Sequence, residues 1–434
     1  MIKKIKNSIS TEKLIFISIM AILIGIPVIC IFIYTCNKLQ IRNVISINHA
    51  HILWWTLPVL AILYVVDMIL HERKVTIIDI LMYLLIILGV VSTIFAVDMK
   101  TSIYGEHARD EGLLSLLSYY LIFLNVKNIS NKKYKDIIIK TIMILGLVNL
   151  TYAILQVYTK ASFIIRFNAP YQALGLCGHP NFFGSYMVTL AAFAFSMYLL
   201  DRKKRYLILS MLFFMGICLC ASTGPLLSFI LMAIFFVIYY RKQIKWKNLL
   251  KIASLLVIIY FFVAYSVTFV QNKILNNNKV KSDYYASSMV KDFKSDNLGN
   301  GRVKIWEGSL PLLKKYWPIG AGIDNFGKVY GVRDGVYYDK AHNIYLQIAI
   351  TNGIFALIIY LTVIGYIFFK GLKIKDAKYI SLLMAFVAYC IQAFANINVV
   401  EVAPTFFAIS GLVLGKIQND QKRIKKVKES WILS

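Results

Sequence analysis

The feature that most constrains this chain is the recurrence of apolar runs long enough to cross a lipid bilayer. An α-helix rises about 1.5 Å per residue, so about 20 apolar residues span the roughly 30 Å hydrocarbon core. Of the 434 residues, 59% are hydrophobic and 16% are charged, which is more apolar surface than a soluble domain buries. The sequence therefore predicts an all-α, polytopic membrane helical bundle, with one domain over residues 1–434.

We expect about twelve transmembrane helices. The seventh and eighth are separated only by Ser222-Thr223-Gly224-Pro225, which fits either a helical hairpin or a broken helix. The first is too long for a cleaved signal peptide, which predicts a retained helix. The expected spans are 14–34, 51–70, 76–97, 112–126, 137–158, 181–200, 206–221, 226–240, 249–270, 343–369, 379–396 and 402–415.

The net charge of +27 follows the membrane topology rather than a nucleic-acid partner. Lysine and arginine clusters fall in every second connection between spans, which is the positive-inside pattern. An even number of spans then predicts a multi-pass protein of the cytoplasmic membrane with both termini in the cytoplasm. The segments expected outside are 35–50, 98–111, 159–180, 222–225, 271–342 and 397–401.

The large extracytoplasmic loop 271–342 is the one connection long enough to hold short helices of its own. A helix is expected from Asn300 to Tyr316, kinked or split at Pro311. Its apolar face is predicted to contain Val303, Trp306, Leu310 and Leu313. Beyond it, Gly320 and Gly322 permit a tight backbone path.

No cofactor or metal is expected from the sequence. The six cysteines lie mostly in or beside apolar runs and form neither a disulfide framework nor a zinc motif. They are Cys30, Cys36, Cys177, Cys218, Cys220 and Cys390. An acidic metal motif, a nucleotide-sugar site and a phosphate-cradling glycine loop are also not evident.

Arginine is much rarer than lysine, yet several arginines fall in the expected outer segments. A guanidinium keeps its charge near a membrane and grips phosphate oxygens through paired hydrogen bonds, which suits an anionic lipid phosphate. The alternative is a solvated or headgroup-contacting charge, which is favoured for two of them, Arg42 and Arg333. For Arg109, pairing with the neighbouring acids is a further alternative. Arg302 stands at a helix start, where free backbone donors also attract anions. The outer arginines are Arg42, Arg109, Arg166, Arg302 and Arg333.

Two further polar stretches are candidates for chemistry. His342 and Asn343 stand where the loop meets the tenth span, and an imidazole with a pKa near roughly 6.5 can accept a proton from a sugar hydroxyl. By chemistry alone, a role for both residues in capping the helix is favoured. The segment Gly175–Gly184, containing Gly178 and Asn181, admits close backbone approach at the start of the sixth span.

Together these stretches resemble the O-antigen ligase and polymerase family of integral-membrane glycosyltransferases, over about residues 100–415. The C-terminal signature, within 300–415, is similar to Arg302…Ile305-Trp306, Pro318…Gly320…Gly322…Asn325-Phe326 and Ala341-His342-Asn343-Ile344-Tyr345-Leu346-Gln347…Gly353. Leu176-Cys177-Gly178-His179-Pro180-Asn181 and Gly105…Arg109-Asp110-Glu111-Gly112 resemble further elements. The family often has an arginine after a serine or threonine where this chain has Ser222-Thr223-Gly224-Pro225.

The resemblance implies a GT-C-like fold and a donor glycan carried on polyprenyl diphosphate. It implies His342 and Arg302 as catalytic residues, and Arg302, Arg109 and Arg166 as ligands of the diphosphate, with Arg166 as a replacement for the missing arginine. Supporting roles fall to Asn343, Gly178, Asn181, Glu111, Trp306, Gly320 and Gly322. The acceptor is a lipid, a glycan or a protein hydroxyl, and membrane lipids surround the chain.

The sequence is also consistent with other classes of membrane protein. Twelve spans with both ends inside also suit a transporter or a flippase of lipid-linked oligosaccharide. Such proteins place ionisable groups near the bilayer middle, whereas Asp67 and Asp79 fall near the expected cytoplasmic ends of their spans. A protein O-oligosaccharyltransferase and an inactive scaffold are further alternatives.

Overall fold

The computed structural model describes residues 10–38, 49–106, 109–159, 171–274, 299, 301–333 and 335–433. Arg42 and Arg166, and the part of the long loop at 275–298, lie outside the described residues. Within the described chain nearly all regular structure is helical, and the only strands form one two-residue hairpin. The prediction of an all-α polytopic membrane bundle is confirmed.

The bundle consists of helices that correspond one to one with the twelve expected spans. Nine of those described are long and apolar enough to cross a membrane, and α6, α9 and α18 complete the set. They are α2 (Thr11–Lys38), α3 (His51–Leu70), α4 (Ile77–Ile94), α6 (Leu113–Asn128), α7 (Lys132–Tyr158), α8 (Pro180–Asp201), α9 (Lys204–Leu219), α10 (Thr223–Tyr240), α11 (Trp246–Phe269), α16 (Ile354–Gly371), α17 (Ala377–Gln392) and α18 (Ala403–Leu433).

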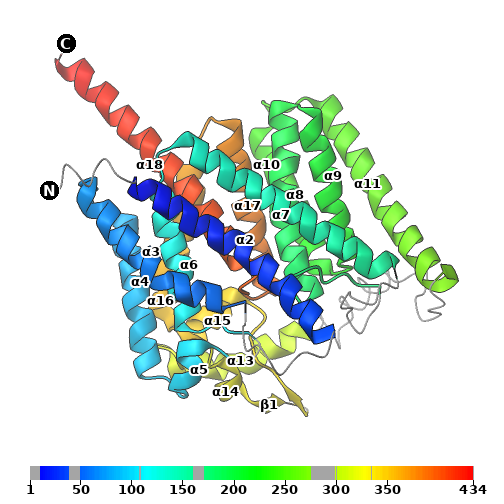
Figure 1. Cartoon of the computed structure of the whole chain (residues 1–434), viewed down its shortest axis with the longest axis horizontal. Coiled ribbons are helices and arrows are strands. Elements are labelled where there is room, and N and C mark those ends of the chain that lie inside the picture. The colour runs from blue at the N-terminus through cyan, green and yellow to red at the C-terminus, as the bar shows by residue number, and fades with distance from the viewer. Residues whose placement is uncertain are drawn as a thin grey trace.

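Helix α8 is the most deeply buried element, and α9, α10 and α17 pack on it, while α2 and α7 cross diagonally in front of the others (Figure 1). Gly184, in the first turns of α8, lies against both Cys220 and Pro225. The end of α9 and the start of α10 therefore meet at one end of α8, which makes the pair a helical hairpin rather than one broken helix.

A set of short elements covers one end of the bundle. We call the described residues 299–343 the cap. It contains α13 (Arg302–Tyr316), α14 (Phe326–Tyr330), β1 (Val332–Arg333) and β2 (Val336–Tyr337), and α15 (Ile344–Thr351) leads from it into α16. The start of α2 and the end of α18 lie at the opposite end, as Figure 1 shows. An even number of crossings produces this arrangement.

The cap has a small core of its own, formed by Ile305, Leu312, Phe326, Tyr330, Ala341 and Ile350. Helix α13 is continuous through Pro311, so it is not split there. The residues of α13 buried against the rest of the protein include Ile305 and Leu312, whereas Leu310, on the predicted apolar face, is 60% exposed. The helix starts at Gly301 in a left-handed conformation, with no side chain capping it.

Two predicted boundaries were wrong. The expected span 343–369 is divided into α15 and α16, because Gly353 has a φ of 90° and its Cα packs against the Pro318 carbonyl. Helix α18 continues from the expected end at 415 to Leu433. The added turns are rich in lysine, and local helix-forming residues extend a helix beyond its apolar part.

A few backbone contacts fix the cap to the bundle. Ala321 N donates to Ile350 O at 2.9 Å and Val97 N donates to Ala321 O at 3.0 Å. A Cβ on Gly320 would lie 2.3 Å from Thr351 O, and one on Gly322 would lie 2.3 Å from Ala96 Cβ. Both glycines have a positive φ, so they are required for the close approach that the sequence predicted. They position the chain that leads to the candidate site.

Candidate active site

The candidate site forms where α13, the turn before α6, the start of α8 and the start of α15 meet below the cap. Trp306 Nε1 donates to Ala341 O at 3.0 Å, so α13 holds the backbone beside His342. Arg302 lies four residues earlier on the same helix, about 6 Å along its axis. The structure thus brings Arg302 and His342, 40 residues apart in the chain, to the same end of the bundle.

Arg109 reaches this region from the turn that precedes α6. Its Nε donates to Asp339 Oδ2 at 2.6 Å, and its Cζ lies 5.4 Å from the centroid of the Phe182 ring. The expected alternative was pairing with neighbouring acids, but the partner belongs to the cap. The contact directs the guanidinium to the first turn of α8.

The first turn of α8 carries a second histidine. His179 caps the helix, with its Nδ1 accepting from Asn181 N at 3.2 Å, and its ring lies 4.9 Å from that of Phe182. Asn181 accepts a hydrogen bond from the Ser222 hydroxyl. Gly178 supplies the preceding positive φ of 72°. The segment Gly175–Gly184 thus lies beside Arg109 and Ser222.

The two histidines are electrostatically coupled to the arginines. Burial, followed by the charge of Arg302, lowers the pKa of His342 to about 4, with a smaller contribution from Arg109. Burial, followed by Arg109, lowers the pKa of His179 to about 4, and His342 and Arg302 contribute. These side chains therefore lie near enough to one another for the arginine charges to act on both histidines. Both imidazoles are neutral at pH 7.

We refer to Arg109, His179, Arg302, Asp339 and His342 as the Arg–His cluster. It contains two guanidinium groups and one carboxylate, so its charge at neutral pH is net positive among these described residues. Arg302 sits at the N-terminus of α13, where the helix dipole adds positive potential. Such a site attracts an anion of more than one charge.

His342 adopts a φ of 49°, which is rare for a residue with a side chain. Next to it, Asn343 accepts hydrogen bonds from Tyr345 N and Leu346 N, at 3.0 and 3.1 Å. Asn343 therefore caps α15, and His342 stands outside the helix. The interpretation of both residues as caps holds only for Asn343.

The side chain of Glu111 contacts residues outside the Arg–His cluster. Its Oε1 accepts from Tyr119 Oη at 2.7 Å, and it lines a small cavity with Lys340, Gln347 and Asn398. Desolvation raises the pKa of Glu111 to about 7, and Lys340 opposes the rise. Lys340 forms an ion pair with Asp324. Asp339 and Lys340 thus face the cluster and the cavity respectively.

Sequence reasoning missed three charged residues, Asp324, Asp339 and Lys340. The first is at a φ of 60° between Gly322 and Asn325, and the others directly precede Ala341-His342. A search for ionisable residues beside the His-Asn motif would have found the second and third. The ion pairs join residues far apart in the chain, so no local pattern predicts them.

The molecule defined by this fold and site is a polytopic all-α membrane protein with a positively charged polar site under a helical cap. Residues 208–361 match the family model described as O-antigen ligase. The resemblance to the O-antigen ligase family expected from the sequence is thereby confirmed for this stretch of the chain, which is about a third of its length. A comparison with curated proteins found no match.

The matched residues run from α9 to α16, a shorter stretch than the expected 100–415. Arg302, Trp306, Gly320, Gly322, His342 and Asn343 lie within it. Arg109, Glu111, Gly178 and Asn181 lie outside it. The family likeness therefore extends from α9 through α10, α11, the cap and α15 into α16, and the residues before α6 and at the start of α8 join this part only in space.

Proposed function

We propose that the protein transfers a glycan from polyprenyl diphosphate to an acceptor hydroxyl at the outer face of the cytoplasmic membrane, for surface polysaccharide assembly. The observation that carries the proposal is the convergence of Arg302, Arg109 and His342 under the cap. The charge suits a diphosphate, and the neutral imidazole suits a proton acceptor.

In this mechanism the acceptor oxygen attacks the anomeric carbon of the donor glycan. The bond between that carbon and the diphosphate oxygen breaks, and its electron pair leaves with the diphosphate. His342 takes the acceptor hydroxyl proton, and the two guanidinium groups neutralise the leaving group. Attack opposite the leaving group inverts the anomeric centre. The activated donor supplies the driving force, so the mechanism uses no metal or ATP.

Arg109 fills the role of the arginine that the family often has near Ser222. Its guanidinium lies over Phe182, beside Asn181, and Asn181 is hydrogen-bonded to Ser222. This places a positive charge close to the Ser222–Pro225 turn from another part of the chain. Arg166 remains a proposed second ligand.

A transporter is less well supported by the charges inside the bundle. Asp67 is paired with Arg73, and Asp79 is paired with Lys127, all near the end of the bundle opposite the cap. Paired charges near one end suit a structural role better than a transport pathway through the bilayer.

The test is transfer by purified protein in liposomes that contain a glycan linked to polyprenyl diphosphate. His342→Ala is expected to lower the transfer rate by about 10²–10⁴-fold, since it removes a general base. Arg302→Ala is expected to weaken donor turnover, and Arg302→Lys to restore only part of it. The matched control is Arg333→Ala, which removes an exposed arginine of β1.

Wild-type rates for His342→Ala at normal expression would remove this residue from the mechanism. Glycan length in cells lacking the protein then identifies the acceptor. Single repeats left on the lipid indicate a polymerase, and full-length glycans left on the lipid indicate a ligase or a protein-glycosylating enzyme.

A further inference from the structure

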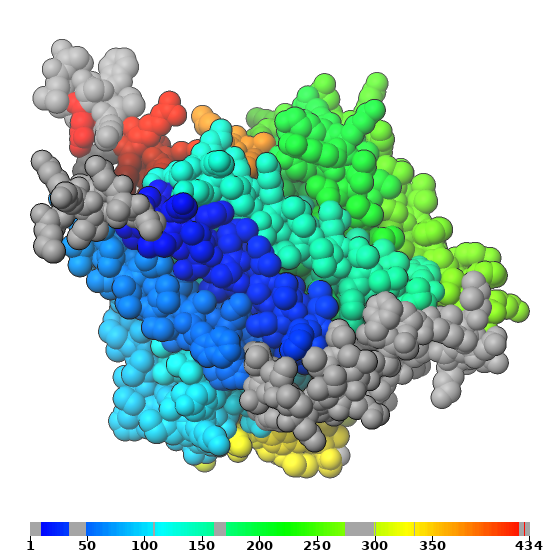
Figure 2. Space-filling model, viewed as in Figure 1, coloured from blue at the N-terminus to red at the C-terminus, as the bar shows by residue number. Residues whose placement is uncertain are grey.

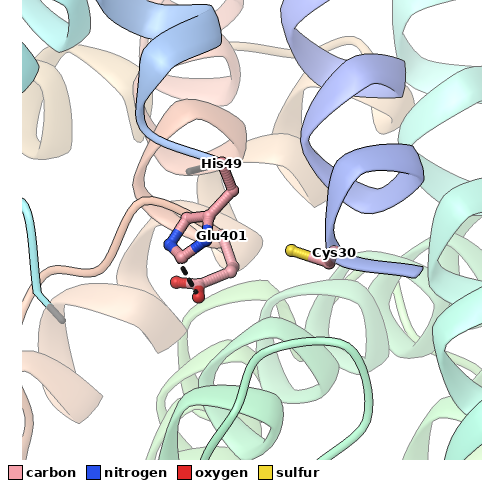
Figure 3. Close-up of side chains that lie close together, drawn as sticks. All are labelled: Cys30, His49 and Glu401. Carbon is pink, nitrogen blue, oxygen red and sulfur yellow. Dashed lines mark ion pairs between the residues drawn. The ribbon is translucent and has the colours of Figure 1, made fainter. Parts of the chain in front are cut away.

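A second cluster of polar side chains lies at the capped end of the bundle, outside the Arg–His cluster. Cys30 belongs to α2, His49 precedes α3 by two residues, and Glu401 precedes α18 by two residues. Figure 3 shows the three side chains converging from these separate segments. His49 Nε2 and Glu401 Oε1 are 3.3 Å apart, and the ligand atoms of all three residues lie within 4.8 Å of one another.

We propose that Cys30, His49 and Glu401 bind one Zn²⁺ ion. Zinc is held at about 2.0–2.3 Å by sulfur, nitrogen and oxygen ligands, so neighbouring ligands of a tetrahedral site are roughly 3.3–3.6 Å apart. The His49–Glu401 separation already has this value. The thiol of Cys30 needs a shift of at most about 1.5 Å, which a side-chain rotation supplies.

The charges of the three ligands also favour a divalent ion. A thiolate, a carboxylate and a neutral imidazole carry two negative charges, which Zn²⁺ cancels in a region where uncompensated charge is costly. The thiolate and imidazole are poor ligands for Mg²⁺ and Ca²⁺, which prefer oxygen. The ligand set therefore selects zinc among common divalent ions.

The exposure of the three side chains is consistent with entry of an ion. The side chains of His49 and Glu401 are 19% and 13% exposed, whereas Cys30 is 2% exposed, so an ion reaches the site from the histidine side. Cys30 and Glu401 also line a small cavity with Asn149, Cys177 and Thr405. The cavity is lined mostly by apolar side chains, and these polar groups lie on its wall, so the fourth zinc position is proposed to face them and take a water molecule.

The ion would join three segments that are distant in the sequence. Helix α2 would be fixed to the starts of α3 and α18, next to the turn that carries Arg109. A role in holding the bundle end in place does not depend on the proposed glycosyl transfer, so its tests use metal binding and stability.

The first measurement is zinc content. The full chain, purified in detergent with a tag free of histidine, is loaded with ZnCl₂, freed of loose metal on a chelating column and analysed by elemental mass spectrometry. We expect about one Zn²⁺ per chain. Cys30→Ser, His49→Gln and Glu401→Gln are each expected to weaken retention at least about tenfold. Cys390→Ser and His51→Gln are the matched controls and are expected to retain it.

The second measurement uses the wild-type protein and does not depend on how well the variants fold. Co²⁺ in place of zinc is expected to give a thiolate-to-cobalt absorption band in the near ultraviolet. ZnCl₂ is expected to raise the unfolding temperature of the wild type, and MgCl₂ is not. Absence of bound zinc and of the cobalt band in the wild type would overturn the proposal. Equal zinc content in the wild type and all three ligand variants would do so as well.

Discussion

At the residue scale, the chain holds its two site arginines by different means. Arg302 is the first residue of α13, and its Nη1 donates to Gly299 O at 3.0 Å. Arg109 is held by a carboxylate of the cap and by the face of Phe182. The first position depends on a helix start and the second on tertiary contacts. One guanidinium group is thus positioned by local structure and the other by long-range contacts.

The low pKa of His342 predicts the pH dependence of the reaction. Below its pKa the imidazole is protonated and cannot accept the acceptor proton, so the rate falls as the pH decreases. In the free protein this limb is expected near pH 4, where burial and the arginines place the pKa. A bound diphosphate brings negative charge close to His342 and raises its pKa. The acid limb of kcat is therefore expected at a higher pH than that of kcat/KM.

The measurement is a pH profile of both parameters in liposomes. Arg302→Gln removes one cause of the low pKa and is expected to move the kcat/KM limb upward, and Arg333→Gln is expected to leave it in place. An acid limb of kcat/KM near the ordinary pKa of histidine, about 6.5, would contradict the electrostatic coupling.

At the element scale, the cap is positioned by glycines whose backbone touches the bundle. Gly320 and Gly335 both have a positive φ, of 82° and 75°. A Cβ on Gly320 would lie 2.3 Å from Thr351 O, whereas a Cβ on Gly335 would meet nothing within 4 Å. Substituting the two glycines therefore distinguishes the effect of backbone strain, which both share, from that of a steric collision, which occurs only at Gly320.

Gly320→Ala is therefore expected to destabilise the cap more than Gly335→Ala. Both alanines bear the cost of a left-handed backbone, about 1–2 kcal/mol. Only the first also collides with a carbonyl and must displace α15 from the cap. We expect transfer activity to fall in Gly320→Ala and to stay near wild type in Gly335→Ala, with proteolysis of the cap reporting its displacement. Similar proteolysis of the two variants would show that the close contact is not required.

Comparison of the predicted with the observed elements shows which structural features are encoded locally in the sequence. Apolar runs are local properties, so all twelve helices of the bundle were predicted from them. The division between α15 and α16 was missed because Gly353 breaks an otherwise apolar run only through its contact with Pro318. The site was predicted where motifs carry it, at Arg302 and His342. Asp339 and Lys340 were missed because their partners, Arg109 and Asp324, are distant in the sequence and meet them only in the folded structure.

At the scale of the whole molecule, the cap and the chain ends lie at opposite ends of the bundle. Figure 2 shows one broad face between them that is formed largely by α2, α3 and α7. Many large apolar side chains are exposed on the described helices, among them Ile62, Ile87, Phe261 and Phe262. In water such a surface would aggregate, and in a bilayer it contacts lipid. The two polar ends must then face opposite compartments.

This arrangement predicts which end is accessible from outside the cell. Lys314 is exposed on α13 of the cap, and Lys422 is exposed on the opposite end, in α18. With the positive-inside orientation, Lys314→Cys in intact cells is expected to react with a membrane-impermeant maleimide. Lys422→Cys is expected to react only after the cells are lysed. Labelling of the unmodified protein measures the background from the six native cysteines, five of which have described side chains that are buried or partly buried. The reverse pattern would place the Arg–His cluster in the cytoplasm, where the proposed transfer at the outer face is impossible. Labelling of both positions from outside would mean that an even number of crossings separates them, in conflict with the three helices α16, α17 and α18 that lie between the cap and Lys422.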